Sequence, residues 1–156
     1  MDYYDVSIGI AEPSGEGIAD IYTALRLHDS CIGRGFFKSG VCNGNGNPCK
    51  TCNGVRDIDY LKRVNNSPTT FTWANANCGG QVHCLGYVYS EAVWSLYARE
   101  LKGSPYNYDD NTAMEIVTRL TYIAAGNIQT WFSGRLVRMH TCLDSTALAL
   151  NSHYFF

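Results

Sequence analysis

The stretch PSGEGIADIYTALRLH, residues 13–28, carries the first clear helical pattern of the chain. Its apolar residues recur at the spacing of one helix face: Ile18, Ile21, Tyr22 and Leu25. Ser14 is a residue type that often caps helices, so the pattern predicts a helix from Ser14 to about His28. Glu16 and Asp20 lie four positions apart, so this helix would present two carboxylates on one side.

Two interpretations fit the acid pair. The N-terminal end of a helix dipole favours acidic side chains whatever the protein does. Alternatively, Glu16 ligates a divalent metal ion. Asp20 would then orient a histidine ligand by a hydrogen bond, without contacting the metal itself. The spacing by itself favours the first interpretation, because acid pairs four residues apart are common in single sequences.

Two more helices are predicted downstream, which makes the expected fold mainly α-helical. The segment SEAVWSLYAREL, residues 90–101, would begin with Ser90 as its cap and end at Lys102-Gly103. A third helix should run from about Asn111 to Phe132, and its strong apolar periodicity predicts a place at the centre of the core.

The segments between these helices are expected to be mostly irregular. Residues 29–55 are rich in Gly and Asn, which favour turns, and predict a long loop. Residues 55–63 suit a short helix or a turn, and residues 65–73 suit an extended strand-like segment. Residues 78–86, CGGQVHCLG, are expected to form a tight turn that presents His83.

Seven cysteines are many for a chain of this length, and six of them cluster in the first 84 residues: Cys31, Cys42, Cys49, Cys52, Cys78 and Cys84. This usage predicts a loop stapled by disulfides in an oxidising compartment, with the isolated Cys142 left as a free thiol. A structural zinc site is the alternative. It would use Cys49 and Cys52 with Cys42, or with Cys78 and Cys84. The secreted-type composition favours disulfides.

The totals narrow the range of partners and locations. A chain of 156 residues suits one domain with its own core. A formal net charge of -2 offers no footprint for nucleic acid or an anionic membrane, and the apolar runs are too short to span a bilayer. The first residues do not resemble a signal peptide. The cysteine usage therefore leads us to expect that the chain is part of a longer secreted precursor.

Three motifs in order resemble the thermolysin-like, or gluzincin, zinc metallopeptidases of a secreted bacterial branch. They are GEGIAD at 15–20, GVRDIDYLKR at 54–63 and GGQVHCLG at 79–86. The resemblance covers residues 1–134 and leaves residues 135–156 as an unmatched tail. It implies a helical C-terminal subdomain of such a peptidase. It also implies that Glu16 is a zinc ligand, Asp20 its supporting acid, Arg56 a substrate contact and His83 a stabiliser of the transition state.

The sequence departs from this family in one important respect. No His-Glu-x-x-His motif is present, although in the family that motif supplies two zinc ligands and the general base. The chain is therefore expected to correspond to a region that begins just after that motif, and a truncated and frame-shifted gene is one hypothesis. His83, His140 and His153 are the candidates for further zinc ligands. His28 lies three helical turns from Glu16, too far to join it.

The sequence therefore supports two hypotheses of function. The first is a zinc-dependent hydrolase with weak or promiscuous activity on activated ester, phosphoester or peptide bonds of a small-molecule or peptide substrate. The second is an inert fragment that only folds and oligomerises. In both cases the apolar surface left by the missing N-terminal half predicts a homodimer or larger homo-oligomer.

Overall fold

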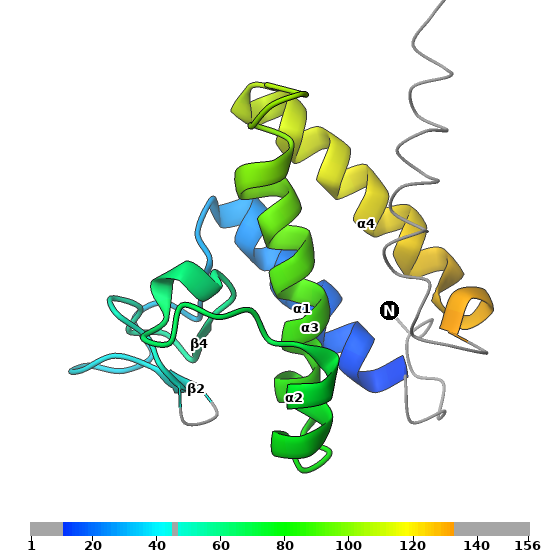
Figure 1. Cartoon of the computed structure of the whole chain (residues 1–156). Coiled ribbons are helices and arrows are strands. Elements are labelled where there is room, and N and C mark those ends of the chain that lie inside the picture. The colour runs from blue at the N-terminus through cyan, green and yellow to red at the C-terminus, as the bar shows by residue number, and fades with distance from the viewer. Residues whose placement is uncertain (1–10, 45–46, 133–156) are drawn as a thin grey trace, which may run out of the picture.

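The computed structural model describes residues 11–44 and 47–132. Within these ranges the chain is mainly helical, as expected, and its helices enclose the main hydrophobic core (Figure 1). The α-helices are α1 (Ala11–Leu27), α2 (Phe71–Asn77), α3 (Val82–Ser95) and α4 (Asp110–Phe132). A π-helical turn, η3 (Leu96–Glu100), extends α3 at its C-terminal end.

Short strands lie in the segment between α1 and α2. β1 (Cys31–Ile32) pairs antiparallel with β4 (Arg56–Asp57), and β2 (Asn43–Gly44) pairs with β3 (Asn47–Pro48). A 3-10 turn, η2 (Tyr60–Lys62), follows. We call the described part of residues 29–64 the cysteine-rich loop, and it projects to one side of the helices (Figure 1).

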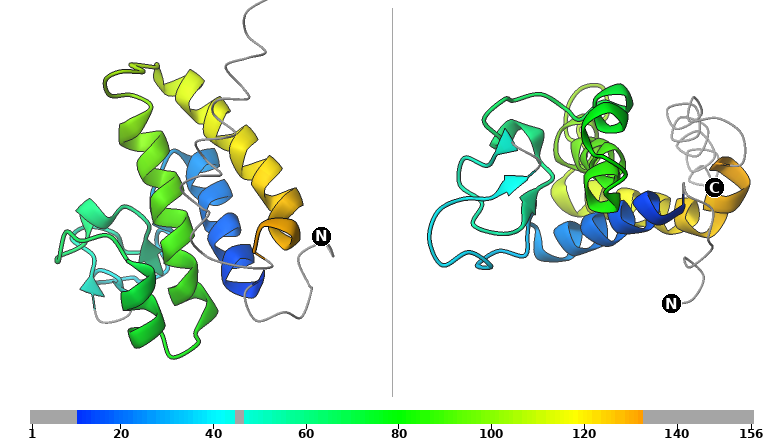
Figure 2. Two further views of the ribbon diagram at one scale, coloured as in Figure 1. Left: turned by 45° about the vertical axis from the view of Figure 1, so that its right-hand side comes forward. Right: turned by 90° about the horizontal axis from the view of Figure 1, so that it is seen from below.

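The helix α3 occupies the centre of the molecule. It packs along α1 on one side, and the cysteine-rich loop lies on another (Figure 2). Its Tyr87 and Val93 are buried together with Ile21 and Ala24 of α1 and Val117 of α4. The third predicted helix, α4, contributes Val117 to this core, as its periodicity indicates, and it packs against α1 and η3.

The first helix begins earlier than its sequence suggests. It starts at Ala11 rather than at Ser14, so Ser14 lies inside the first turn and is not the cap. Pro13 is compatible with this start, because backbone N–H groups in the first turn have no partner within the helix. The predicted end is confirmed. His28 takes a left-handed conformation (φ 51°), and the Asp29 amide donates to the Ala24 carbonyl, which closes the helix.

The second predicted helix begins eight residues before its expected start. Gln81 is the N-cap of α3, and its side chain accepts a hydrogen bond from the Cys84 amide. Ser90 is therefore not a cap: it is buried within the helix, where its hydroxyl donates to the Gly86 carbonyl. The tight turn ends at Gln81, so His83 is presented by the first turn of a helix rather than by a loop.

Two other predicted segments are partly wrong. Residues 55–63 form the short strand β4 and then the turn η2, rather than one helix or turn. Residues 71–73, expected to be extended, open the helix α2, because the Thr70 side chain accepts a hydrogen bond from the Trp73 amide and caps it. The expected bounds of α4 agree with the structure to within one residue.

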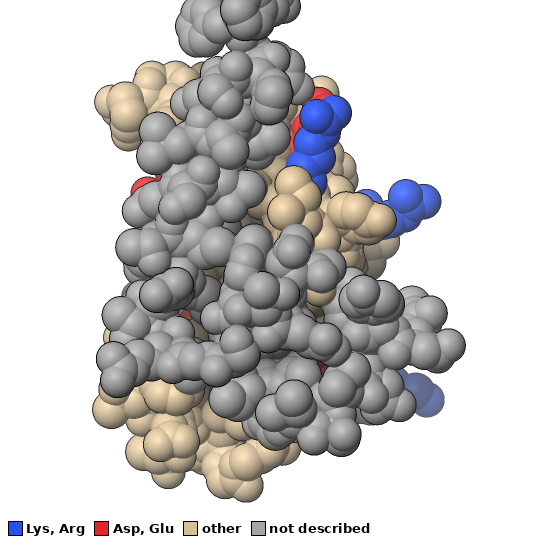
Figure 3. All heavy atoms as spheres, turned by 90° about the vertical axis from the view of Figure 1, so that its right-hand side faces the viewer, with Lys and Arg blue, Asp and Glu red and all other residues tan. Residues whose placement is uncertain are grey.

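Several sequence predictions concern residues outside the described ranges. The boundary after residue 134 and the tail 135–156 belong to this group, and so do His140, Cys142 and His153. None of the helices that the structure describes has the length and apolar character needed to cross a bilayer. On the face shown in Figure 3, most of the visible described surface is uncharged, with a few Lys and Arg side chains along one edge.

Candidate functional site

The four site residues predicted from the sequence lie together in the structure. Glu16 and Asp20 come from α1, Arg56 from β4 and His83 from the first turn of α3. A chain of contacts links Asp20 to Arg56, Arg56 to His83 and His83 to Glu16. We call these four residues the acid–arginine–histidine cluster.

Asp20 and Arg56 form the buried end of this cluster. Arg56 donates from Nε to Asp20 Oδ2 over 2.6 Å and from Nη2 to Asp20 Oδ1 over 2.7 Å. Only 5% of the Asp20 side chain and 13% of the Arg56 side chain are exposed. Burial by itself lowers the pKa of Arg56, but the hydrogen bonds and charge of Asp20 outweigh burial and raise it. The bidentate contact thus fixes the orientation of both side chains.

Glu16 and His83 form the open end of the cluster. Glu16 Oε2 lies 2.9 Å from His83 Nδ1, and 37% and 43% of the two side chains are exposed. Arg56 Nη2 lies 3.4 Å from the same Nδ1. Nδ1 can either donate a hydrogen bond to Glu16 or accept a hydrogen bond from Arg56. The contact with Glu16 is the shorter of the two. Both groups are therefore paired yet reachable from solvent.

The close crossing of α1 and α3 brings Glu16 and His83 together. Gly17 lies next to Glu16, and a Cβ atom at this position would meet the Gly86 carbonyl oxygen at 2.7 Å and the Tyr89 side chain at 3.2 Å. Only glycine allows the backbones of α1 and α3 to approach this closely. Because of this approach, the first turn of α3 lies beside the acids of α1, and His83 reaches Glu16.

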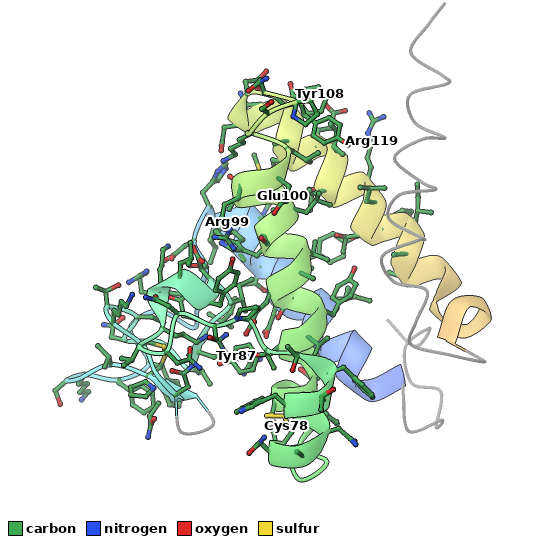
Figure 4. The ribbon with its side chains drawn as sticks, viewed as in Figure 1. Cys78, Tyr87, Arg99, Glu100, Tyr108 and Arg119 are labelled. Atoms are coloured by element: carbon green, nitrogen blue, oxygen red, sulfur yellow. A yellow bond between two sulfur atoms is a disulfide. The ribbon has the colours of Figure 1, made fainter. Side chains whose placement is uncertain are left out.

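Tyr87, one turn after His83, lies between α3 and the cysteine-rich loop (Figure 4). Its side chain is buried, and the Arg63 guanidinium lies over its ring, 5.1 Å from the ring centroid. Burial raises the pKa of the Tyr87 hydroxyl, so this group stays neutral in the folded protein. Tyr87 therefore forms a neutral wall beside the charged cluster.

The structure differs from the sequence prediction in the contact that Asp20 makes. The sequence predicts that Asp20 orients a histidine ligand, whereas its two carboxylate oxygens bind Arg56. Asp20 therefore reaches His83 only through the guanidinium, and in the described residues it acts as a positioning group for Arg56. The distance between the three motifs in the sequence does not reveal which pairs form.

The fit of this site to a zinc ion is partial. A catalytic zinc usually has three protein ligands and one water molecule. The described part of the cluster offers one carboxylate, Glu16, and one imidazole, His83. His28 is excluded as predicted, because it lies at the other end of α1 with its Nδ1 3.6 Å from Asp110 Oδ2. The remaining candidates, His140 and His153, fall outside the described ranges.

A second buried charge pair, which the sequence predictions do not include, lies close to the cluster. Arg63 Nη2 lies 2.6 Å from Glu91 Oε1, and both side chains are 3% exposed. The Thr69 amide and hydroxyl also donate to the Glu91 carboxylate, over 2.7 Å and 2.8 Å. The sequence did contain a signal for this pair. Glu91 lies on the buried face of α3 among apolar side chains, and a lone acid in such a position needs a partner.

The cysteines form three disulfide pairs in the described residues, which confirms the predicted stapled loop. Cys31 pairs with Cys52, Cys42 with Cys49, and Cys78 with Cys84. The first four cysteines share one buried cluster. The other pair joins the end of α2 to the first turn of α3, in a separate cluster (Figure 4). A zinc site that uses Cys49, Cys52, Cys78 and Cys84 together, one sequence alternative, is therefore wrong.

The three sulfur atoms of Cys42, Cys49 and Cys52 all lie within 4.8 Å of one another. Their separation is compatible with a metal ion, which is the other sequence alternative.

Comparisons with protein-family models, with curated proteins and with solved structures found no match to this chain. A function must therefore be inferred from the geometry described above.

Proposed function

We propose that the chain is a zinc-dependent hydrolase of thermolysin-like descent, weakly active on activated ester, phosphoester or peptide bonds. The acid–arginine–histidine cluster is its site. The observation that supports this proposal is the meeting of Glu16, Asp20, Arg56 and His83, which three separate segments contribute, in one half-open cluster. These are the residues that the resemblance names for metal binding, positioning, substrate contact and transition-state stabilisation.

Arg56 is the group that would hold the substrate. A guanidinium has five N–H donors, and Asp20 uses two of them. The remaining N–H groups can bind a carbonyl or phosphoryl oxygen, and the bidentate contact with Asp20 keeps the plane of the guanidinium fixed. Asp20 therefore contributes as a positioning residue: it is buried and acts on the substrate only through Arg56.

His83 would stabilise negative charge that develops on the substrate oxygen. Its imidazole is reachable from solvent and lies 3.4 Å from the Arg56 guanidinium, so both can face one substrate oxygen. If the Glu16 carboxylate binds a metal cation, His83 loses its carboxylate partner. The imidazole can then donate a hydrogen bond to the substrate instead. A donor of this kind typically contributes about 10²–10³-fold to the rate.

Glu16 would be the first zinc ligand, with His83, His140 and His153 as candidates for the others. Zinc, when bound, would polarise the scissile bond and lower the pKa of a bound water molecule. A cluster without the general-base glutamate of its proposed relatives transfers protons poorly. We therefore expect substrates with good leaving groups to be hydrolysed faster than peptides, because they need less proton transfer.

A second candidate function has its own support. The contacts Glu16–His83 and Asp20–Arg56 already give each of the four groups a partner and connect α1 to both α3 and the cysteine-rich loop. In this alternative the cluster is a structural bridge, and the chain folds and oligomerises without chemistry. The absence of bound zinc and of metal-dependent turnover would favour it.

The test of the proposed function is metal content and turnover of the oxidised chain, in which the six cysteines of the described residues are locked in disulfides. We expect close to one zinc per chain by elemental analysis, together with chelator-sensitive hydrolysis of a p-nitrophenyl ester and of a p-nitrophenyl phosphodiester. Glu16→Ala should abolish both zinc binding and turnover. His83→Ala should keep zinc and lower the rate by about 10²–10³-fold if it acts on the substrate oxygen.

Two exposed residues provide matched controls. Glu115→Ala removes a glutamate that pairs only with Arg119 on the surface of α4, and His28→Ala removes an exposed histidine at the end of α1. Both should keep zinc and activity. Zinc that survives in Glu16→Ala, or turnover that no chelator removes, would contradict the proposal.

Location and assembly belong to the same proposal. The disulfides fit an oxidising compartment, so we propose that the parent protein is secreted. We also propose that the chain acts as a homodimer or larger homo-oligomer on a small-molecule or peptide substrate. Among the described residues, large apolar side chains such as Phe36 and Phe71 are exposed, and a second copy would cover such surface.

A further inference from the structure

The cysteine-rich loop contains four cysteines in one buried cluster. At most 2% of each residue is exposed: Cys31, Cys42, Cys49 and Cys52. Two separate disulfides do not need to lie together, because each one closes its own segment of chain. Here the sulfur of Cys52, which is bonded to Cys31, lies within 4.8 Å of the sulfurs of both Cys42 and Cys49.

The backbone holds this cluster by bonds that do not depend on the disulfides. The Cys42 amide donates to the Cys52 carbonyl over 2.7 Å, and the Cys49 amide donates to the Cys42 carbonyl over 2.7 Å. Cys31 belongs to β1, which pairs with β4 shortly after Cys52. These hydrogen bonds would keep the four side chains directed at one point when the sulfur–sulfur bonds are reduced.

The sulfur atoms of Cys42, Cys49 and Cys52 lie close enough together to bind one tetrahedral metal ion. A zinc–sulfur bond is about 2.3 Å long, which places the sulfurs of a tetrahedral site about 3.8 Å apart. Three of the sulfurs already lie within 4.8 Å of one another, and the fourth is next to Cys52. The Cys49-x-x-Cys52 spacing is also the one that structural zinc sites use for two adjacent ligands.

The turn after Cys52 is shaped to support a charged sulfur. The Gly54 amide donates to Cys52 Sγ over 3.3 Å, and such outer partners stabilise a thiolate on a metal. A Cβ atom at Gly54 would lie 2.2 Å from the Ile32 carbonyl oxygen, so the turn accepts only glycine. The geometry of this turn therefore explains why a glycine follows Cys52 two residues later in the Cys-x-x-Cys-x-Gly sequence.

We propose that the reduced chain binds one zinc ion through Cys31, Cys42, Cys49 and Cys52, and that the two disulfides are the oxidised form of the same site. In the reduced state four thiols release four protons and ligate Zn²⁺ as thiolates. Oxidation by a disulfide-forming oxidant removes four electrons, forms Cys31–Cys52 and Cys42–Cys49, and releases the zinc ion.

This site would give the loop a cross-link in either redox state. Apart from the four cysteines, Ile58 is the one apolar side chain of the cysteine-rich loop that is buried in the described structure. A segment with so little apolar core needs a staple to stay folded. In a reducing environment zinc would supply that staple, because metal binding contributes its free energy directly to folding.

The test uses the full chain reduced without oxygen by a water-soluble phosphine. Each disulfide is reduced to two thiols while one phosphine takes an oxygen atom from water and becomes its oxide. Cobalt(II) is then titrated as a spectroscopic substitute for zinc. We expect one cobalt per chain to bind with a thiolate-to-cobalt charge-transfer band and the visible spectrum of tetrahedral cobalt, in addition to any cobalt on the acid–arginine–histidine cluster. Added zinc should displace it.

Variants assign the ligands. Cys42→Ser and Cys52→Ser should each lower the cobalt affinity by more than about 100-fold, because loss of a ligand exceeds the loss of an outer partner. Cys31→Ser should also weaken binding and reduce the charge-transfer intensity. The matched control is the double variant Cys78→Ser and Cys84→Ser, which removes the other cysteine pair and should leave the spectrum unchanged.

Two further measurements distinguish this four-sulfur site from metal binding elsewhere on the chain. Glu16→Ala should keep the charge-transfer band, because a metal on the acid–arginine–histidine cluster would not have four sulfur ligands. The reduced wild type in denaturing urea should bind cobalt more weakly, because the fold no longer assembles the four thiols. A spectrum that lacks thiolate charge transfer, or binding that is equal in urea or is lost in the Cys78/Cys84 control, would overturn the proposal.

Discussion

At the scale of single residues, two pairs of buried charged side chains compensate each other. The bidentate contact between Arg56 and Asp20 leaves neither charge alone, and the same holds for Arg63 with Glu91. Removing one partner of such a pair is costly, because it leaves a buried charge uncompensated. The two pairs have different chemical surroundings, however. The Asp20–Arg56 pair adjoins the half-open end of the cluster, whereas Glu91 is enclosed by α3 and the segment before α2.

The enclosure of Glu91 gives a pH-dependent prediction. Burial raises its pKa to about 7, although Arg63 and Thr69 pull it down. In the unfolded chain the group would titrate near 4.5. Since the folded pKa is the higher one, the contribution of Glu91 to stability is fully present below the unfolded pKa and is lost as the pH rises through 7.

We expect the free energy of unfolding to fall by about 2 kcal/mol on this account between roughly pH 5 and pH 7. Urea denaturation across that range would show the slope, and it should flatten in Glu91→Gln. Glu115→Gln on the exposed surface should keep it. A carboxyl carbon-13 resonance of Glu91 that titrates below pH 5 would show the prediction to be wrong.

At the scale of elements, the crossing of α1 and α3 decides whether the site exists. Glu16 and His83 face each other because Gly17 lets the two backbones approach. Gly15, one residue before Glu16, has no heavy atom within 4 Å of where a Cβ would lie. The two glycines of this turn therefore differ. Gly17 is required by a close backbone contact, whereas a side chain at Gly15 would meet no neighbour.

This difference predicts opposite effects of the same substitution. Gly17→Ala should lower the free energy of unfolding by about 1–3 kcal/mol, because the new methyl group meets the Gly86 carbonyl and overpacks the crossing. Gly15→Ala should raise it by about 0.5–1 kcal/mol, because alanine is the better helix former.

Thermal unfolding followed by circular dichroism would measure both variants of this helix. The Gly17→Ala substitution should also weaken the proposed zinc binding, since it pushes Glu16 away from His83. Equal stability changes in the two variants would mean that α1 and α3 do not approach as closely as the structure shows.

At the scale of the whole molecule, several large apolar side chains are exposed on the described surface. Several of them lie on the cysteine-rich loop and the segment just after it: Phe36, Phe37, Val41, Val55, Leu61, Val64 and Phe71. Tyr122 and Ile123 on α4 are exposed as well. Apolar surface of this kind is stabilised when another protein surface covers it.

We predict that the chain forms a homodimer or a larger homo-oligomer in solution. Light scattering coupled to size-exclusion chromatography should give at least twice the 17.3 kDa of one chain. Specific turnover per chain should fall on dilution below the dissociation constant if assembly completes the site. A mass of one chain at working concentration would contradict the prediction.

Much of this arrangement can be predicted from local patterns in the sequence. Periodic apolar positions indicate α1 and α4, and Gly/Asn-rich sequence with many cysteines indicates a stapled loop. The order of three motifs also predicts the four residues of the cluster. Short-range rules are less successful at helix starts: the sequence favours Ser90 as a cap, but Gln81 supplies the cap and Ser90 is buried in the helix.

The sequence by itself determined which residue types can act: a glutamate and an aspartate one turn apart, an arginine, a histidine and a cluster of thiols. Local periodicity and composition are properties of neighbouring residues, so they are readable without a structure. Only the tertiary structure decided the pairs: Asp20 with Arg56, Glu16 with His83, and Cys31 with Cys52. These contacts join residues far apart in the chain, and they depend on how closely α1, α3 and the cysteine-rich loop pack.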